Sequence, residues 1–281
     1  MSIKLLCDTL CDIPDEITNK EYVDVVPLTV IFPDMEYKET IDITKEEFYR
    51  IVKEKDCIPK TSQATYMDFK TRYDKYVEEG YDIICITGAA KSSGTFQSAC
   101  IAKADMEKGN IEVFDTNNLS LGSGQYVIKA CELIEQGKGL QEICAELNEL
   151  HKSTILLFMP YTLKYLKASG RVPVAAAILG NMLNIKPILH FDNGEGKLIS
   201  TTRGNKQMAS KLVDVMLDMC KGRNISDLIV TIGCGDNMKE VKKLEEEVKN
   251  RIKCKKIFFA RGGAAICSHT GPDILALSCS Y

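Results

Sequence analysis

The first half of the chain alternates short apolar stretches with segments that carry helix-start signals. Strands are predicted at residues 3–7, 23–32, 81–87 and 111–114. Helices are predicted at residues 44–53, 65–79, 93–108 and 119–135. Thr44 is followed three residues later by Glu47, which is the spacing of a capping box, and Thr65 takes the N-cap position before the next helix. This alternation predicts a parallel sheet with helices on both faces, and therefore an α/β fold.

The second half of the chain predicts a mixed α/β unit. Strands are expected at residues 154–159, 185–191, 197–201, 228–233 and 256–260. Helices are expected at residues 162–168, 173–183, 205–220 and 238–252, after a last helix of the first half at residues 140–151. The turn Asp192-Asn193-Gly194 is the strongest hairpin signal in the sequence. A chain of 281 residues is long for one core, so we predict an N-terminal domain at 1–155 and a C-terminal domain at 156–281, with a cleft between them.

Charge and hydropathy exclude two classes of partner. The net charge of -3 and the isoelectric point near 5.8 provide no basic field, so nucleic acid is not expected as a partner. No run of about 18 apolar residues exists in the sequence, so no integral membrane contact is expected. The first residues show no basic leader followed by a long apolar stretch, which predicts a cytoplasmic protein.

The 12 cysteines are expected to be free and mostly buried. They stand mainly inside apolar runs, as Cys85 and Cys131 do, and free cysteine is among the most buried residue types. The sequence has no CxxC motif, and His151, His190 and His269 are scattered along the chain, with His269 in a predicted turn before Thr270-Gly271-Pro272. Neither a metal site nor a redox pair is therefore predicted.

Two hydroxyl-rich segments are candidates for holding an anion. Thr61-Ser62-Gln63 is predicted to form a loop between Pro59 and the helix that begins at Thr65, near the positive end of that helix. Ser92-Ser93-Gly94-Thr95 lies where a strand passes into a helix, the edge at which ligands collect in open α/β sheets. The alternative for the first segment is that its hydroxyls only satisfy helix-end amides.

Known loop motifs do not fit the second segment. Gly88 is followed five residues later by Ser93 and not by glycine, and no Gly-Lys-Ser/Thr follows, so it is not a P-loop. A dinucleotide loop is absent because no GxGxxG follows a strand. The flanking glycines of a serine-hydrolase elbow, GxSxG, are also missing.

Four blocks of the sequence together resemble the DegV family of fatty-acid-binding proteins. They are residues 59–63, 93–99, 179–189 and 269–272, and they occur in the order of that family and span nearly the whole chain. Gly170-Arg171-Val172 precedes the third block. The resemblance implies a two-domain DegV-like fold that binds a long-chain fatty acid, such as palmitate, in a tunnel between the domains. It implies no catalytic residue and no cofactor apart from the bound fatty acid.

The resemblance also assigns roles to particular residues. It places the ligand carboxylate on hydroxyls of Thr61 and Ser93, with His269 near it. The ligand-binding residues that it implies are Thr61, Ser62, Ser93, Gly94, Thr95 and His269. Arg171 and Arg203 are implied to lie near the surface where a phosphate or a separate fatty acid kinase would approach, so that the kinase makes the acyl-phosphate. Without the resemblance, either arginine could be an ordinary surface residue.

Some residues depart from the family pattern. Leu10 stands in the opening motif, Ala89 and Ala90 replace paired serines, and Asp273 replaces the last glycine of the His269 motif. These changes affect the expected chain-length preference and the surroundings of the carboxylate. Residues 156–159 and 172–179 are candidates for lining the tunnel. The alternative function is a serine hydrolase or acyltransferase that uses Ser93 with His269 and Asp8.

Overall fold

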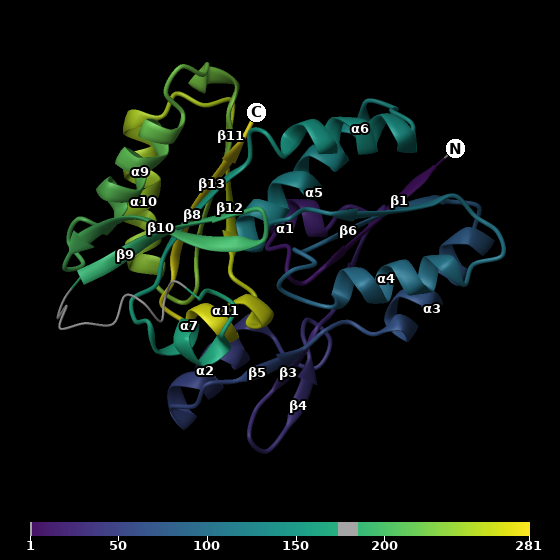
Figure 1. Ribbon diagram of the computed structural model, residues 1–281, viewed down its shortest axis with the longest axis horizontal. Helices are drawn as coiled ribbons and strands as arrows, with labels where there is room; N and C mark the ends of the chain where they lie inside the picture. Colours follow the sequence, from purple (N-terminus) through teal and green to yellow (C-terminus); the bar gives the residue numbers. More distant parts are fainter. Residues whose placement is uncertain (1, 174–184) are drawn as a thin grey trace.

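The computed structural model of the protein describes residues 2–173 and 185–281 (Figure 1). The core of its first half is a four-stranded parallel sheet. The sheet has the order β2-β1-β6-β7 and all its pairs are parallel. Its strands are β1 (Ile3–Asp8), β2 (Val23–Val26), β6 (Asp82–Thr87) and β7 (Ile111–Asp115). The predicted parallel sheet is confirmed.

Helices cover both faces of this sheet because successive residues of its strands point to opposite sides. Leu6 packs with α3 and α4, whereas its neighbours Leu5 and Cys7 pack with α5 and α6. The four helices are α3 (Tyr66–Glu78), α4 (Thr95–Ala104), α5 (Ser120–Glu135) and α6 (Leu140–Leu150). The near-continuous apolar strands of the sequence are thus explained by burial on both faces.

The second half forms a six-stranded mixed sheet of order β10-β9-β8-β13-β11-β12, in which only β11 and β12 are parallel. Its strands are β8 (Ile155–Met159), β9 (Ile185–Asp192), β10 (Glu195–Arg203), β11 (Ile229–Cys234), β12 (Lys256–Arg261) and β13 (Leu275–Ser280). Helices α9 (Met208–Met219) and α10 (Met238–Arg251) cover one face. The predicted mixed unit and its hairpin at Asn193 and Gly194, both with positive φ, are confirmed.

A small third sheet corrects two predictions. Strands β3 (Thr29–Ile31), β4 (Glu36–Lys38) and β5 (Lys60–Ser62) pair antiparallel in the order β4-β3-β5. The single strand predicted at 23–32 is wrong, because Pro27 has no N–H to continue a ladder and the amide of Leu28 donates to Thr9 Oγ1 instead. The prediction that residues 61–63 form a loop is wrong for Thr61 and Ser62, which belong to β5.

Other boundaries differ from the prediction. Helix α4 starts at Thr95 and not at Ser93, and His269 lies in α11 and not in a turn. Besides β4, β5 and the short 3₁₀ helix at residues 225–227, the elements that were not predicted are α1 (Asp15–Thr18), α11 (Ala264–Thr270) and β13. The remaining helices are α2 (Lys45–Lys55), α7 (Lys164–Ser169) and the short η1 (Ile225–Asp227). The predicted helix at 173–183 and the family block at 179–189 lie largely outside the described residues.

The two large sheets share packed side chains. One apolar cluster contains Tyr126 of α5 together with Ile229 of β11 and Phe258 of β12, so α5 packs against both halves of the chain. The division into domains 1–155 and 156–281 stays a prediction.

Two buried carboxylates hold the start of α11. The amide of Gly263 donates to Asp12 Oδ1 over 2.7 Å, the amide of Ala265 donates to Glu39 Oε2 over 3.0 Å, and the amide of Ala264 donates to Glu39 Oε1. These acceptors satisfy helix-start amides that have no partner within the helix. Burial raises the pKa of Asp12, and burial with the nearby Asp12 charge raises the pKa of Glu39 to about 7.

We expect Glu39→Ala to lower the free energy of unfolding by about 2 to 4 kcal/mol, because it leaves two buried amides without acceptors. Glu39→Gln should lose less, since one amide oxygen remains as an acceptor. Urea unfolding measures both changes. Glu36→Ala, at an exposed position of β4, is the control and should change little. Equal stability of Glu39→Ala and wild type would show that these contacts do not support the fold.

Candidate functional site

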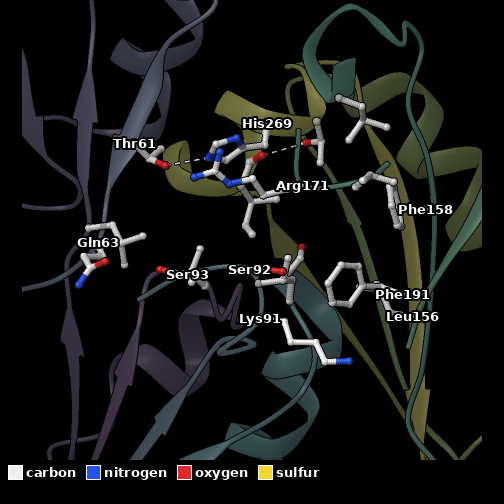
Figure 2. Close-up of a pocket in the computed structure, with 18 of the residues that line it drawn as sticks. Thr61, Gln63, Lys91, Ser92, Ser93, Leu156, Phe158, Arg171, Phe191 and His269 are labelled. Carbon is white, nitrogen blue, oxygen red and sulfur yellow. Dashed lines mark hydrogen bonds between the residues drawn. The ribbon is translucent and has the colours of Figure 1, made fainter. Parts of the chain in front are cut away.

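A cavity of about 530 Å³ lies where the three sheets meet (Figure 2). This volume lies within the range of small-molecule sites. Its wall contains Leu10, Leu28, Thr61, Ser62, Gln63, Ala90, Lys91, Ser92, Ser93, Gly94, Leu119, Ser120, Leu156, Phe158, Leu166, Arg171, Val172, Phe191, Ile266, His269, Thr270, Ile274 and Ala276. The cavity therefore draws on segments from both halves of the chain.

The parallel sheet presents the carboxyl ends of its strands to the cavity. Leu10 follows β1, residues 90–94 follow β6, and Leu119 and Ser120 follow β7. The chain leaves β1 for β2 on one side and returns to β6 on the other, which makes the β1/β6 junction the switch point of the sheet. The cavity therefore lies at the carboxyl ends of the parallel strands, which is the edge of the sheet where a ligand was predicted to bind.

Asp8 joins the two strand ends at this junction. Its carboxylate accepts hydrogen bonds from the amide of Gly88 over 3.3 Å and from the amide of Leu10 over 3.0 Å. Burial raises the pKa of Asp8 to about 7, against the effect of these two amides. Asp8 therefore does not line the cavity; it holds together the backbone of the two loops that do.

Polar and apolar groups lie on different sides of the cavity. Figure 2 shows Thr61, His269 and Arg171 together at one side, with Ser93 facing the same space, while Phe158 and Phe191 lie across from them. Phe158 comes from β8 and Phe191 from β9; both belong to the face of the mixed sheet that α9 and α10 do not cover. Such a cavity suits a molecule with one polar end and a long apolar part.

Thr61 and His269 form a direct pair across 208 sequence positions. Thr61 Oγ1 lies 2.7 Å from His269 Nε2. Burial, reinforced by the positive charge of Arg171, lowers the pKa of His269 to about 4, so the imidazole is neutral at pH 7. When the neutral ring carries its proton on Nε2, it donates to Thr61, and the Thr61 hydroxyl keeps its own proton for an acceptor in the cavity.

The Ser93 loop is tied to the end of β5. Ser93 Oγ lies 2.9 Å from Thr95 Oγ1, and Thr95 Oγ1 also accepts a hydrogen bond from the amide of Ala64 over 3.3 Å. Gln63 Nε2 donates to the carbonyl of Gly94, where a Cβ would lie 2.0 Å from Gln63 Oε1. A side chain at position 94 would therefore displace the Gln63 amide from this contact. Thr95 is buried and lies behind Ser93, so it positions the loop and does not line the cavity.

The two predicted arginines have different locations. Arg171 lines the cavity and also a second hollow of about 350 Å³, which shares Thr61 and His269 with the first and adds Lys60. Arg203 is exposed at the end of β10 and lines neither hollow. The structure thus brings Arg171, but not Arg203, to the head of the cavity.

The β9–β10 hairpin reaches the rim of the cavity. The amide of Gly194 donates to the carbonyl of Asn117 over 2.8 Å, and Lys91 Nζ donates to the carbonyl of Asn193 over 3.0 Å. These contacts join the mixed sheet to loops of the parallel sheet beside the cavity.

Sequence reasoning missed several lining residues. Lys91 stands directly before the segment that begins at Ser92, and Lys60 stands directly before Thr61, so their proximity to the two hydroxyl segments was the available signal. Ile266 and Ile274 had no such signal, because α11 and β13 were not predicted.

The contacts of Ser93, His269 and Asp8 do not form a catalytic relay. The Ser93 hydroxyl is bonded to Thr95, His269 Nε2 is bonded to Thr61, and Asp8 is bonded to backbone amides. A serine nucleophile requires a base within hydrogen-bonding reach, which in turn needs an orienting acid. The arrangement gives no support to the hydrolase alternative.

Residues 2–173 and 185–281 contain no group of three or more histidine, cysteine or acidic side chains arranged to hold a metal ion. Within the same residues, no helix combines the length and the apolar character needed to cross a bilayer. All 12 cysteines are free, and eight of them are buried.

Comparison with known proteins gives matches over nearly the whole chain. A family model described as "Uncharacterised protein, DegV family COG1307" matches residues 2–281. A DegV domain-containing protein of Clostridium acetobutylicum is 35% identical over 272 residues, which cover 96% of this chain and 95% of that protein.

Solved structures match equally well. A fatty acid-binding DegV family protein from Thermus thermophilus has a TM-score of 0.90 and 32% identity, covering 100% of this chain and 99% of that one. A stearic acid-binding protein from Eubacterium ventriosum has a TM-score of 0.89 and 25% identity, covering 100% and 98%. The predicted fold class is confirmed by these neighbours.

We expect the His269 ring to titrate near pH 4, well below the ordinary value of 6.5, because burial and Arg171 oppose its protonation. Since the folded protein prefers the neutral ring, the stability that this preference contributes is complete above pH 6.5 and is lost as the pH falls to about 4. NMR titration of the ring Cε1–H measures the midpoint. A midpoint at 6.5 or above would contradict the neutral-ring description of the Thr61 pair.

Proposed function

This chain belongs to the DegV family, and from that premise we propose that it binds a long-chain fatty acid, such as palmitate, in the cavity between its two halves. The carboxylate lies at the Thr61 and Ser93 hydroxyls and the acyl chain runs along the apolar wall. One observation carries this proposal: the cavity combines a polar side, with Thr61, Ser93 and His269, and an apolar side, with Phe158 and Phe191.

The apolar wall supplies most of the expected affinity. Each methylene removed from water contributes about 0.8 kcal/mol, so about 14 methylenes contribute on the order of 11 kcal/mol before the cost of association is subtracted. A short acid lacks this contribution. The protein should therefore discriminate strongly by chain length.

Neutral donors suit a carboxylate that must react later. A bidentate arginine would neutralise the carboxylate and lower its nucleophilicity, whereas hydroxyl groups orient it and leave an oxygen free. Thr61 and Ser93 are such donors, with Ser62 and the Gly94 backbone beside them. Thr95 acts through Ser93, to which it is hydrogen bonded.

The finer proposal is that a separate fatty acid kinase phosphorylates the bound acid. Lys60 and Arg171 line the second hollow, which shares Thr61 and His269 with the cavity. A phosphoryl group attached to the carboxylate would meet these two cations there. Exposed Arg203 is proposed to contact the kinase. The sequence has no P-loop motif of its own, which is consistent with a partner that binds the nucleotide.

We therefore infer a cytoplasmic lipid-binding protein that needs no cofactor and presents its ligand, and not a hydrolase. The boundary between the two halves is proposed at residues 155 and 156, with the ligand between them. The first residue of the mixed sheet, Ile155, lies at this boundary.

The first experiment is native mass spectrometry of the purified protein, followed by removal of lipid and calorimetric titration with palmitate and with hexanoate. We expect a copurified long-chain acid and an affinity for palmitate at least about 1,000-fold higher than for hexanoate, because ten more methylenes are buried. Equal affinities for the two acids would remove the basis of the proposal.

Ser93→Ala and Thr61→Ala should each weaken palmitate binding by about 1 to 3 kcal/mol, since each leaves the carboxylate short of one donor. The same titration measures the loss. Thr71→Ala, at an exposed position of α3, is the matched control. If both site variants melt at much lower temperature without ligand, their hydroxyls serve the fold and not the ligand.

Arg203→Ala should leave palmitate affinity unchanged but reduce acyl-phosphate formation when the kinase and ATP are supplied, because an exposed cation acts on the encounter with a partner. Lys197→Ala, on the same strand, controls for loss of a surface charge. Loss of lipid binding in Arg203→Ala would instead assign Arg203 to the head group. If the wild type binds lipid normally but the bound fatty acid is not phosphorylated, the binding proposal stands and only the proposal of a kinase partner is wrong.

A further inference from the structure

Two cysteine thiols that are far apart in sequence meet in the core of the mixed sheet. Cys220 Sγ lies 3.9 Å from Cys279 Sγ across 59 sequence positions. No other two cysteines in residues 2–173 and 185–281 share a hydrogen bond. Cys279 is fully buried and Cys220 is 2% exposed.

The elements that carry the two thiols hold them in place. Cys220 is the C-cap of α9, and Cys279 lies in β13 between β8 and β11. Helix α9 packs on β8 and β13 through one shared apolar cluster. A disulfide needs two sulfur atoms about 2 Å apart, so the two thiols, whose sulfur atoms lie 3.9 Å apart, must approach one another before they can bond.

The surroundings of Cys220 favour a reactive thiolate. The hydrogen bond from Cys279 lowers the pKa of Cys220 below its ordinary value, with Tyr281 and Arg223 adding to the effect against burial. Arg223 also stacks 5.2 Å from the ring of Tyr281. Cys220 directly precedes an exposed turn at residues 221–224, so it lies at the edge of the core and not at its centre.

We propose that Cys220 and Cys279 are a reversible redox pair that closes to an intramolecular disulfide when the protein meets a hydroperoxide. The Cys220 thiolate attacks one peroxide oxygen, the O–O bond breaks, and a sulfenic acid forms on Cys220, while the released hydroxide takes up the proton that the thiol gave up and leaves as water. The Cys279 sulfur then attacks the Cys220 sulfur, the S–O bond breaks, and hydroxide leaves as water with the Cys279 proton. Two thiols and one hydrogen peroxide thus give one disulfide and two molecules of water.

The disulfide would join the end of α9 to β13. It would restrict the unfolded chain by closing a long loop, which stabilises the oxidised protein. Cys279 faces α9, whereas Ala276 of the same strand faces the cavity. Oxidation should therefore change stability much more than it changes the cavity.

The test compares reduced and peroxide-treated full-length protein by non-reducing peptide mapping and by thermal melting. We expect one cross-linked peptide pair that contains Cys220 and Cys279, a mass lower by two hydrogens, and a melting temperature higher by about 5 to 10 °C that dithiothreitol reverses. Palmitate affinity should change less than about 2-fold.

Variants separate this pair from its neighbour Cys254, which packs on the same cluster. Cys254→Ser should form the Cys220–Cys279 cross-link and show the same rise in melting temperature as the wild type. Cys279→Ala and Cys279→Ser should show neither effect; the alanine variant avoids a hydroxyl in the core. A cross-link between Cys220 and Cys254, or a folded wild type whose Cys220 and Cys279 stay thiols under peroxide, would overturn the proposal.

Discussion

The capture of α11 by two buried carboxylates is the interaction on which the site depends. Asp12 comes from the loop after β1 and Glu39 from the segment after β4, so acceptors from two different sheets meet at one helix start. Burying these carboxylates is costly in itself, and the backbone amides of Gly263, Ala264 and Ala265 compensate for it. The far end of the same helix carries His269. The contacts at the start of α11 therefore help to position His269, near the end of the same helix, against Thr61.

The cavity exists because three sheets meet without filling the space between them. The parallel sheet contributes loops at its switch point, where backbone amides and hydroxyls are available. The mixed sheet contributes side chains of a single face, such as Phe158 and Phe191, since the alternate residues of its strands are committed to α9 and α10. The small sheet contributes Thr61 on β5. The cavity is therefore polar where strand ends and loops reach it and apolar where the face of the mixed sheet reaches it.

Local signals in the sequence were enough to predict much of this architecture. The caps at Thr44 and Thr65 and the turn at Asn193-Gly194 are short-range features, and each stands where it was predicted. Ser93 and Thr61 were identified as candidates for one site because of their loops and a family resemblance.

Features that depend on distant pairing could not be predicted in this way. Strand β13 reads as a short apolar run, which could equally be core helix, until β8 and β11 pair with it. The same holds for Thr61 and His269, and for Cys220 and Cys279, because spacing in sequence carries no information about contacts across sheets. The missed sheet β4-β3-β5 consists of three-residue strands, which are too short to show a period.

The hairpin at the cavity rim bears on how this protein tolerates sequence divergence. Its contacts with Asn117 and Lys91 use the backbone of residues 193 and 194, so the identity of the side chain at position 193 contributes little to them. Gly194 is different, because its φ is +78° and a Cβ there would lie 2.8 Å from Cδ of Lys91. A residue other than glycine at position 194 would be strained and would displace the Lys91 side chain, so the backbone conformation of this turn, more than its side-chain contacts, limits which residues the rim can accept.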